Sequence, residues 1–297
     1  MKYALMIGML ATCLNLYAQD LEAILDAEAP PVSDVVLGTF NGTRLLNGHS
    51  IETRKKGVLE FLIQHRFGAI NTGFDELFGL DESNIRFGFE YALTDDLTIA
   101  LGRSSFQKTF DGYVKYRLLK QRSGDKGSPV SLTLFGNAAV KTVKDYEPEN
   151  KPDFQDRMAY TTQVLLARKF NEGLSIQLMP SYVHFNSSPT RNDPNDMFAI
   201  GVGARVEVSK RVSINGEYYY NTNPFESLDT HDALAFGIDI ETGGHIFQLV
   251  FTNSRSMIEK GFIAETTGDF FDGDIHFGFN ISRAFQIVKP KEPEKMF

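Results

Sequence analysis

Apolar and polar residues alternate with a period of two through most of this chain of 297 residues. In residues 85–91, for example, apolar Phe87 and Phe89 alternate with polar positions such as Arg86. The pattern predicts strands with one apolar face, because successive side chains of a strand point to opposite sides. The longer segments reach the length of about 9–11 residues that a tilted transmembrane strand needs, and the shorter ones approach it with their flanking residues. Twelve segments alternate: 59–67, 85–91, 97–101, 114–118, 130–140, 160–166, 174–182, 198–208, 212–220, 234–240, 247–251 and 275–281.

The connections between these segments are sorted by length. Tight turns follow the second, sixth, eighth and tenth segments, and long loops follow the first, fifth, seventh, ninth and eleventh. Two connections fit less well: 121–129 is long for a turn and 104–110 is short for a loop. A membrane barrel has turns on one side and loops on the other, whereas a soluble β-sandwich, the main alternative, does not sort them. The predicted fold class is all-β: an antiparallel transmembrane β-barrel of twelve strands with short periplasmic turns and longer outer loops.

Residues 1–18 are typical of a secretory signal peptide. Lys2 supplies the positive start, residues 4–14 are almost wholly apolar, and Ala18 is a small residue at the predicted cleavage site. An alternative makes Cys13 the lipidated first residue of a lipoprotein. Export by a cleaved signal, together with a barrel, predicts the outer membrane of a Gram-negative bacterium.

Two further segments flank the predicted barrel of residues 57–286. Residues 19–56 form a periplasmic leader, which is either a simple tether or a plug or docking segment. Residues 287–297 are charged, contain two prolines and are predicted to be a frayed C-terminal tail.

Composition excludes several classes of function. The net charge of −8, from 30 basic and 38 acidic residues, argues against a nucleic-acid partner. With Cys13 alone, neither an intrachain disulfide nor a cysteine metal site is possible. The six histidines lack metal-binding spacing, so no metal and no cofactor is predicted. Asp193 with Asp196, and the cluster at 269–274, could bind calcium, but solvated acidic loops are the favoured interpretation.

No catalytic motif is present in the sequence. A Gly-x-Ser-x-Gly elbow, a phosphate loop and a dinucleotide fingerprint are all missing. Ser104 and Ser105 with His65 could be drawn as a membrane-embedded hydrolase, but alternation gives no reason for them to meet. The chain is therefore predicted not to be an enzyme.

Several short motifs carry a resemblance to a known family. They run from Thr43-Arg44-Leu45-Leu46-Asn47-Gly48-His49-Ser50 through His65-Arg66-Phe67-Gly68 to Gly102-Arg103-Ser104-Ser105 and Asp111-Gly112-Tyr113-Val114. Together they resemble an uncharacterised outer-membrane β-barrel family of Gram-negative bacteria, a domain-of-unknown-function group. The resemblance implies an export signal, a barrel and the outer membrane. It brings no activity and no site residues.

Charged residues fall on the predicted inner face of several strands. They are Glu60, Arg66, Arg86, Glu90, Lys115, Arg117, Arg205, Glu207, Glu217, Asp239 and Glu241. The first half of this set is mostly basic and the second mostly acidic. Such charges form either a polarised constriction or a network of ion pairs that fills the lumen, and the network is the more common outcome in a barrel of this size.

The predicted function is passage or binding of a small polar solute in a charged lumen. The alternative is a structural or assembly subunit that docks a protein partner through residues 19–56 or through its outer loops. The expected partners are outer-membrane lipid, a small polar solute and, in the alternative, that protein.

Overall fold

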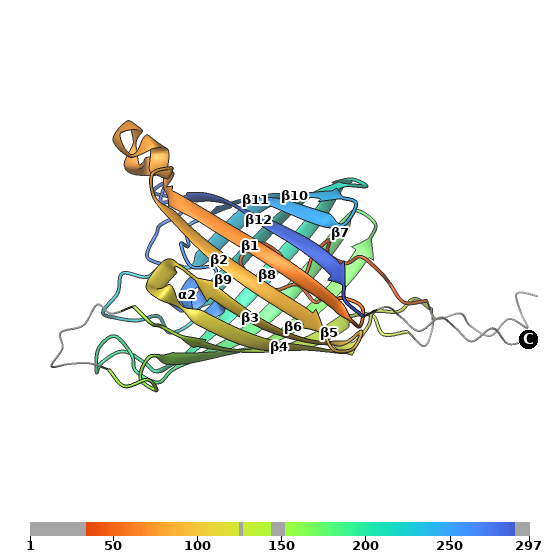
Figure 1. The fold of residues 1–297 in the computed structure, drawn as a ribbon, viewed down its shortest axis with the longest axis horizontal. Helices are drawn as coiled ribbons and strands as arrows, with labels where there is room; N and C mark the ends of the chain where they lie inside the picture. Colours follow the sequence, from red (N-terminus) through yellow and green to blue (C-terminus); the bar gives the residue numbers. More distant parts are fainter. Residues whose placement is uncertain (1–33, 125–126, 144–151, 289–297) are drawn as a thin grey trace, which may run out of the picture.

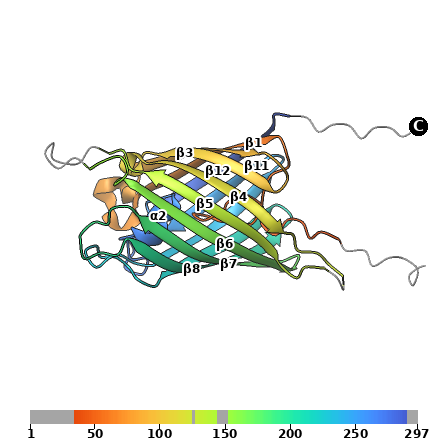
Figure 2. The same cartoon turned by 90° about the horizontal axis from the view of Figure 1, so that it is seen from below.

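The predicted strands close into a single barrel, which Figures 1 and 2 show from two sides. The structure is a computed structural model that describes residues 34–124, 127–143 and 152–288. Every strand pairs with its sequence neighbours in antiparallel fashion, and β12 pairs with β1. The prediction of a twelve-stranded antiparallel barrel is confirmed. The strands are β1 (Val58–Ala69), β2 (Ser83–Ala92), β3 (Leu97–Ser104), β4 (Phe110–Leu119), β5 (Ser131–Val140), β6 (Met158–Asn171), β7 (Leu174–Phe185), β8 (Asp196–Ser209), β9 (Val212–Asn221), β10 (Ala233–Thr242), β11 (His245–Thr252) and β12 (His276–Gln286).

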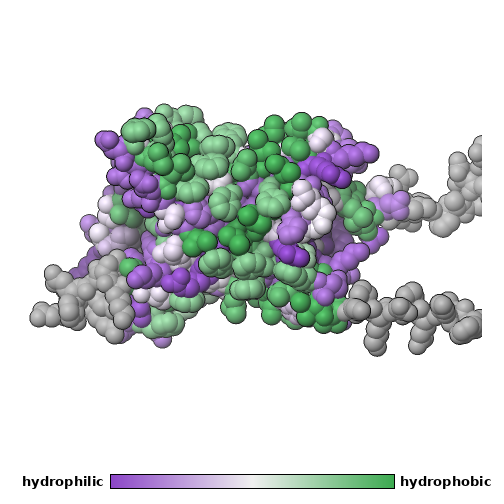
Figure 3. Space-filling view, turned by 45° about the horizontal axis from the view of Figure 1, so that its top comes forward, coloured by the Kyte–Doolittle hydropathy of each residue, from purple (hydrophilic) through white to green (hydrophobic). Residues whose placement is uncertain are grey.

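Side chains alternate between the exterior and the lumen along each strand. In β7, Ile176 and Leu178 are exposed, whereas Ser175 and Gln177 are buried. Apolar side chains gather over the middle of the wall in Figure 3. Among the described residues, no helix combines the length and apolar character needed to cross a membrane. The signal peptide predicted at 1–18 lies outside the described residues.

Most short connections lie at one end of the barrel and most long ones at the other, as predicted, and the two exceptions are the connections from β3 to β4 and from β4 to β5. The tight turns join β2 to β3, β6 to β7, β8 to β9 and β10 to β11, and we call their end the turn end. The opposite end, the loop end, carries η1 (Ile70–Thr72), η2 (Phe74–Gly79), η3 (Phe106–Lys108) and α2 (Glu259–Ala264). The described chain begins and ends at the turn end (Figure 1).

The long connection between β4 and β5 has a structural reason. Val35, in the N-terminal segment, forms an antiparallel bridge with Arg122 of this connection. Backbone hydrogen bonds from Val36 to Gln121 and from Ser123 to Asp34 extend the pairing. The extra residues therefore hold the N-terminal segment at the rim, which a tight turn could not do.

The closed sheet predicts heat-modifiable migration on a detergent gel. A closed barrel leaves no unpaired strand edge and keeps its backbone groups paired, so detergent alone should not unfold it. Unboiled samples should migrate differently from boiled ones, with a urea-unfolded sample as the control. Identical migration of all three samples would contradict a stable closed barrel.

Candidate functional site

The predicted lumen charges occupy different depths of the wall. Arg117 of β4 and Glu207 of β8 are half-buried, and Glu241 is exposed near the turn end of β10. The others are buried, on alternate positions of strands whose remaining positions form the exterior: Glu60, Arg66, Arg86, Glu90, Lys115, Arg205, Glu217 and Asp239.

The lumen also contains part of the N-terminal segment. Residues 39–51, which we call the lumen hairpin, are buried except for half-buried Asn41. They fold back on themselves, because Leu45 N–H donates to the Gly48 carbonyl at 2.9 Å and Ser50 N–H donates to the Thr43 carbonyl at 3.1 Å. Residues 39–51 of the predicted leader thus lie within the barrel, whereas residues 19–33 of that leader lie outside the described residues.

Glu217 of β9 binds the tip of the lumen hairpin. Its carboxylate accepts the Asn47 N–H at 2.7 Å and the Gly48 N–H at 3.2 Å. On the other side, Arg66 of β1 donates to the Asn47 side-chain oxygen at 2.9 Å. Because buried N–H groups and buried charges are both costly without partners, these contacts satisfy the wall and the hairpin together.

Other wall side chains bind backbone groups along the lumen hairpin. Gln177 of β7 accepts the Ile51 N–H at 2.8 Å and donates to the His49 carbonyl at 2.7 Å. Neutral and charged side chains from four more strands donate to hairpin carbonyls: Lys115 to Thr43, Thr133 to Ile51, Gln248 to Leu45, and Asn280 to Leu46. The barrel interior therefore acts as a binding site for a piece of its own chain.

Two glycines of the wall make room for the apolar residues of the lumen hairpin. A Cβ atom at Gly203 would lie 2.6 Å from a methyl group of Leu45, and one at Gly237 would lie 2.4 Å from a methyl group of Leu46. Both distances are shorter than carbon atoms tolerate, so only glycine fits while these leucines are seated. The small residues seen on the inner faces of β8 and β10 thus shape the seat of the hairpin.

Helix α2 enters the lumen from the loop end. All its residues are buried, and its Phe262 ring packs on Tyr219 of β9 with centroids 5.1 Å apart. Glu259 forms a buried ion pair with Arg44 of the lumen hairpin at 3.0 Å and lies 3.4 Å from His49. The hairpin and α2 therefore meet inside the barrel through charge contacts.

Some of the remaining wall charges form ion pairs, and others accept hydrogen bonds from neutral side chains, as Asp239 does from Gln248. Arg86 of β2 forms a two-pronged contact with Asp111 of β4, at 3.0 and 2.5 Å. Arg54, just after the hairpin, forms a similar contact with Glu60 of β1, at 2.6 and 2.5 Å. These contacts join four buried or half-buried charges in two ion pairs within the barrel.

Sequence reasoning missed several residues of this site. Asp111 shares its parity with Lys115, so the period-two rule could have placed it inside the barrel. Glu259 and residues 39–51 lie outside the alternating segments, so that rule says nothing about them.

Two hollows with both charged and apolar residues in their linings lie on either side of the lumen occupants. One, of about 210 Å³, is at the loop end and is lined by residues such as Asn253, Arg255 and Glu265. The other, of about 280 Å³, is at the turn end and is lined by residues such as Thr39 and Arg117. The lumen hairpin and α2 occupy the barrel between these two hollows.

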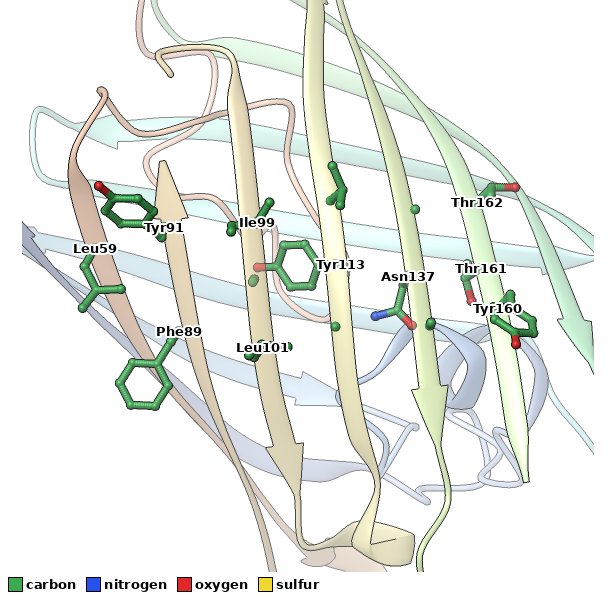
Figure 4. Close-up of a pocket in the computed structure, with 15 residues that line it drawn as sticks. Leu59, Phe89, Tyr91, Ile99, Leu101, Tyr113, Asn137, Tyr160, Thr161 and Thr162 are labelled. Carbon is green, nitrogen blue, oxygen red and sulfur yellow. The ribbon is translucent and has the colours of Figure 1, made fainter. Parts of the chain in front are cut away.

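A larger hollow, of about 730 Å³, lies on the outer face of the wall (Figure 4). Small residues Gly112, Gly136 and Ala138 form its floor, and larger ones such as Phe89 and Tyr160 border it. No charged residue lines it. Its position and lining suit apolar surroundings rather than a polar solute.

The acidic loops use their carboxylates within the protein. Asp193 accepts hydrogen bonds from Thr190 and Ser227, and so joins two loops. Burial alone would raise the pKa of Asp193, but the hydrogen bonds from Ser227 and Thr190 hold it well below its usual range. Within residues 34–124, 127–143 and 152–288, no group of three or more His, Cys, Asp or Glu residues could hold a metal ion.

The residues drawn as a hydrolase do not come together. The His65 ring stacks on Phe279 on the exterior, with centroids 5.0 Å apart. Ser104 is buried on the inner face of β3, and the Ser105 hydroxyl accepts the Ile85 N–H. The wall therefore separates Ser104 from His65.

Comparisons with known proteins agree with this architecture. Residues 40–285 match the family described as a membrane bound beta barrel domain, DUF5777. No curated protein matches the sequence.

Three solved structures are among those that are similar to this chain. The NanC porin is 8% identical, with 76% of this chain and 98% of that chain covered and a TM-score of 0.47. For the KdgM porin in complex with disordered oligogalacturonate, the identity is 9%, the covered shares are 77% and 99%, and the TM-score is 0.46. Omp33 of Acinetobacter baumannii is 8% identical, with 78% of this chain and 100% of that chain covered and a TM-score of 0.42.

The family match spans nearly all of the described barrel, from residue 40 to residue 285. It confirms the resemblance inferred from the short motifs, and it agrees with the closed antiparallel wall and its apolar exterior. The chain belongs to the DUF5777 family of membrane-bound β-barrel domains.

Proposed function

We propose that the protein is an outer-membrane channel for a small polar solute, closed in this conformation by its lumen hairpin and α2. A twelve-stranded barrel is too wide for its own inward side chains to fill completely. Here the filling comes from two separate segments, which enter from opposite ends. A channel that opens by moving these segments needs no change in the strands of the wall.

The proposal rests on the kind of contacts that join the lumen hairpin to the wall and to α2. Besides the packing of its apolar side chains, the lumen hairpin is held by many hydrogen bonds and ion pairs, such as those of Glu217 and Glu259. Water can replace such contacts at small net cost. Once the hairpin leaves, Arg66, Lys115 and Glu217 would line a wet lumen suited to a polar solute.

The proposal includes the orientation of the chain. The turn end faces the periplasm, so the leader enters the lumen from the side on which a cleaved signal would leave it. The predicted cleavage after Ala18 lies outside the described residues. The long loops then face the outside of the cell.

Replacing residues 39–51 by a Gly-Ser stretch of equal length tests the channel. In planar bilayers the unchanged protein should show little steady conductance, whereas the replaced chain should conduct ions continuously. Liposomes carrying the replaced chain should also admit a small neutral sugar. A Gly-Ser replacement of exposed loop residues 153–156 is the matched control and should stay closed. If the replaced chain folds but remains silent, the channel proposal fails.

A further inference from the structure

The connection between β1 and β2 forms an apolar projection on the side of the barrel. Residues 70–80, which we call the apolar knob, contain η1 and η2. The knob lies at the loop end and projects sideways beyond the wall rather than along the barrel axis (Figure 1). It therefore lies beside the apolar exterior and away from the mouth of the lumen.

The knob exposes large apolar side chains. Phe74 is 79% exposed and Phe78 is 53% exposed, and Leu77 and Leu80 are also exposed. The Phe74 and Phe78 rings contact each other, with centroids 6.4 Å apart. These side chains gain little from burial within the part of the chain that the structure describes.

The backbone holds the knob in a strained shape. Leu77 and Phe78 have φ angles of 45° and 55°, in the left-handed region that bulky residues avoid. Gly79 packs so closely on Gly68 of β1 that a Cβ atom at position 79 would lie 2.5 Å from the Gly68 backbone. The strained backbone and its close packing on β1 thus fix the position of the exposed apolar side chains of the knob. None of these side chains contributes to the core.

The knob continues the apolar surface of the wall. Below it, at the ends of β1, β12 and β11, the Phe67, Phe277 and Phe251 rings form a row with neighbouring centroids 5.8 and 5.3 Å apart. Exposed acidic residues, Asp75, Glu76 and Asp81, lie within and beside the knob. The upper left of Figure 3 shows an apolar cluster bordered by polar residues at this end of the molecule.

We propose that the apolar knob is a membrane anchor that inserts into the lipid leaflet at the loop end of the barrel. Its occupant is lipid, because the family places the exterior wall in a membrane and the knob extends that same surface sideways. Phe74 and Phe78 lie among the headgroups and upper acyl chains, where aromatic side chains are favoured. The acidic residues remain in water. The anchor does not depend on whether the lumen conducts.

The absence of tryptophan from the sequence allows a direct test. Phe74→Trp and Phe78→Trp each place one fluorophore in the knob. Phe89→Trp, on the exposed outer face of β2, is the lipid control, and Phe154→Trp, in an exposed loop, is the water control. In vesicles of phosphatidylcholine brominated near the top of the acyl chain, emission from positions 74 and 78 should fall several-fold. Iodide in the buffer should quench position 154 several-fold and leave positions 74 and 78 nearly unchanged.

Two results would overturn the proposal. Quenching of positions 74 and 78 by iodide, at the level of position 154, would place the knob in water. Protection from iodide without quenching by brominated lipid would mean that a protein surface, such as a second copy of this chain, covers the knob. Heat-modifiable migration of each variant establishes that it has folded before it is measured.

Discussion

Gly203→Leu is expected to expel the lumen hairpin and open the barrel without any deletion. The new side chain would occupy the seat of Leu45, whose methyl group lies 2.6 Å from the position of a Cβ atom at residue 203. Overpacking of this kind costs about 1–3 kcal/mol. That cost shifts the docking equilibrium of the hairpin roughly 5- to 150-fold toward release, at about 1.4 kcal/mol per tenfold change. Open probability in planar bilayers measures the shift.

Two further variants separate release of the hairpin from damage to the barrel. Adding Leu45→Gly to Gly203→Leu restores the space and should close the channel again. Gly136→Leu is the matched control, because a Cβ atom at this position on the outer face has no neighbour within 4 Å. It should behave like the unchanged protein. Equal conductance of Gly203→Leu and the double variant would show that Leu45 does not hold the barrel closed.

Arg86→Glu is expected to lower the free energy of unfolding of the barrel more than any exposed charge reversal. Arg86 and Asp111 are buried and joined at 3.0 and 2.5 Å across β3. Removal of one partner leaves the other charge buried without compensation, which typically costs about 3–5 kcal/mol. Reversal adds repulsion between two carboxylates. The urea midpoint for loss of the unboiled gel band measures the effect.

The charge-swapped protein provides the control for this prediction. Arg86→Glu combined with Asp111→Arg restores an ion pair across the same strands and should recover part of the lost stability. Arg103→Glu, on the exposed outer face of β3 near its loop end, should change the urea midpoint little, because charge changes near the edge of the membrane cost little. If Arg86→Glu and Arg103→Glu shift the midpoint equally, the buried pair does not stabilise the barrel.

The strands of the wall could be predicted because the alternation of side chains along a strand is a local property. Side chains of a strand alternate by geometry alone, so the apolar positions of residues 85–91 and 198–208 identify an outer face without any knowledge of neighbouring strands. Within each strand, the positions between the apolar ones face the opposite side, and these include Arg86, Lys115 and Glu217. Alternating loop lengths then distinguished a barrel from a sandwich, because hairpin connections must return to the same two ends.

The contents of the lumen could not be predicted in this way. The backbone of residues 39–51 is bound by side chains of distant strands, with Glu217 lying 170 residues from Asn47. Such contacts leave no periodic signal in the bound segment. Helix α2 is only six residues long and is buried on all sides, so it shows no amphipathic pattern.

The sequence by itself determined a closed wall of twelve strands with an apolar exterior and a charged interior, since these follow from parity and strand length. Only the tertiary structure decided which charges pair and what they hold. Arg86 meets Asp111 because the register places them opposite Ser104 and Gly102 of β3, two positions apart, so that the Arg86 side chain reaches diagonally across β3. Gly203 and Gly237 accommodate leucines because the lumen hairpin enters from the turn end. The first arrangement needs only three consecutive strands. The second depends on closure of the barrel, which brings the lumen hairpin against strands far from it in the chain.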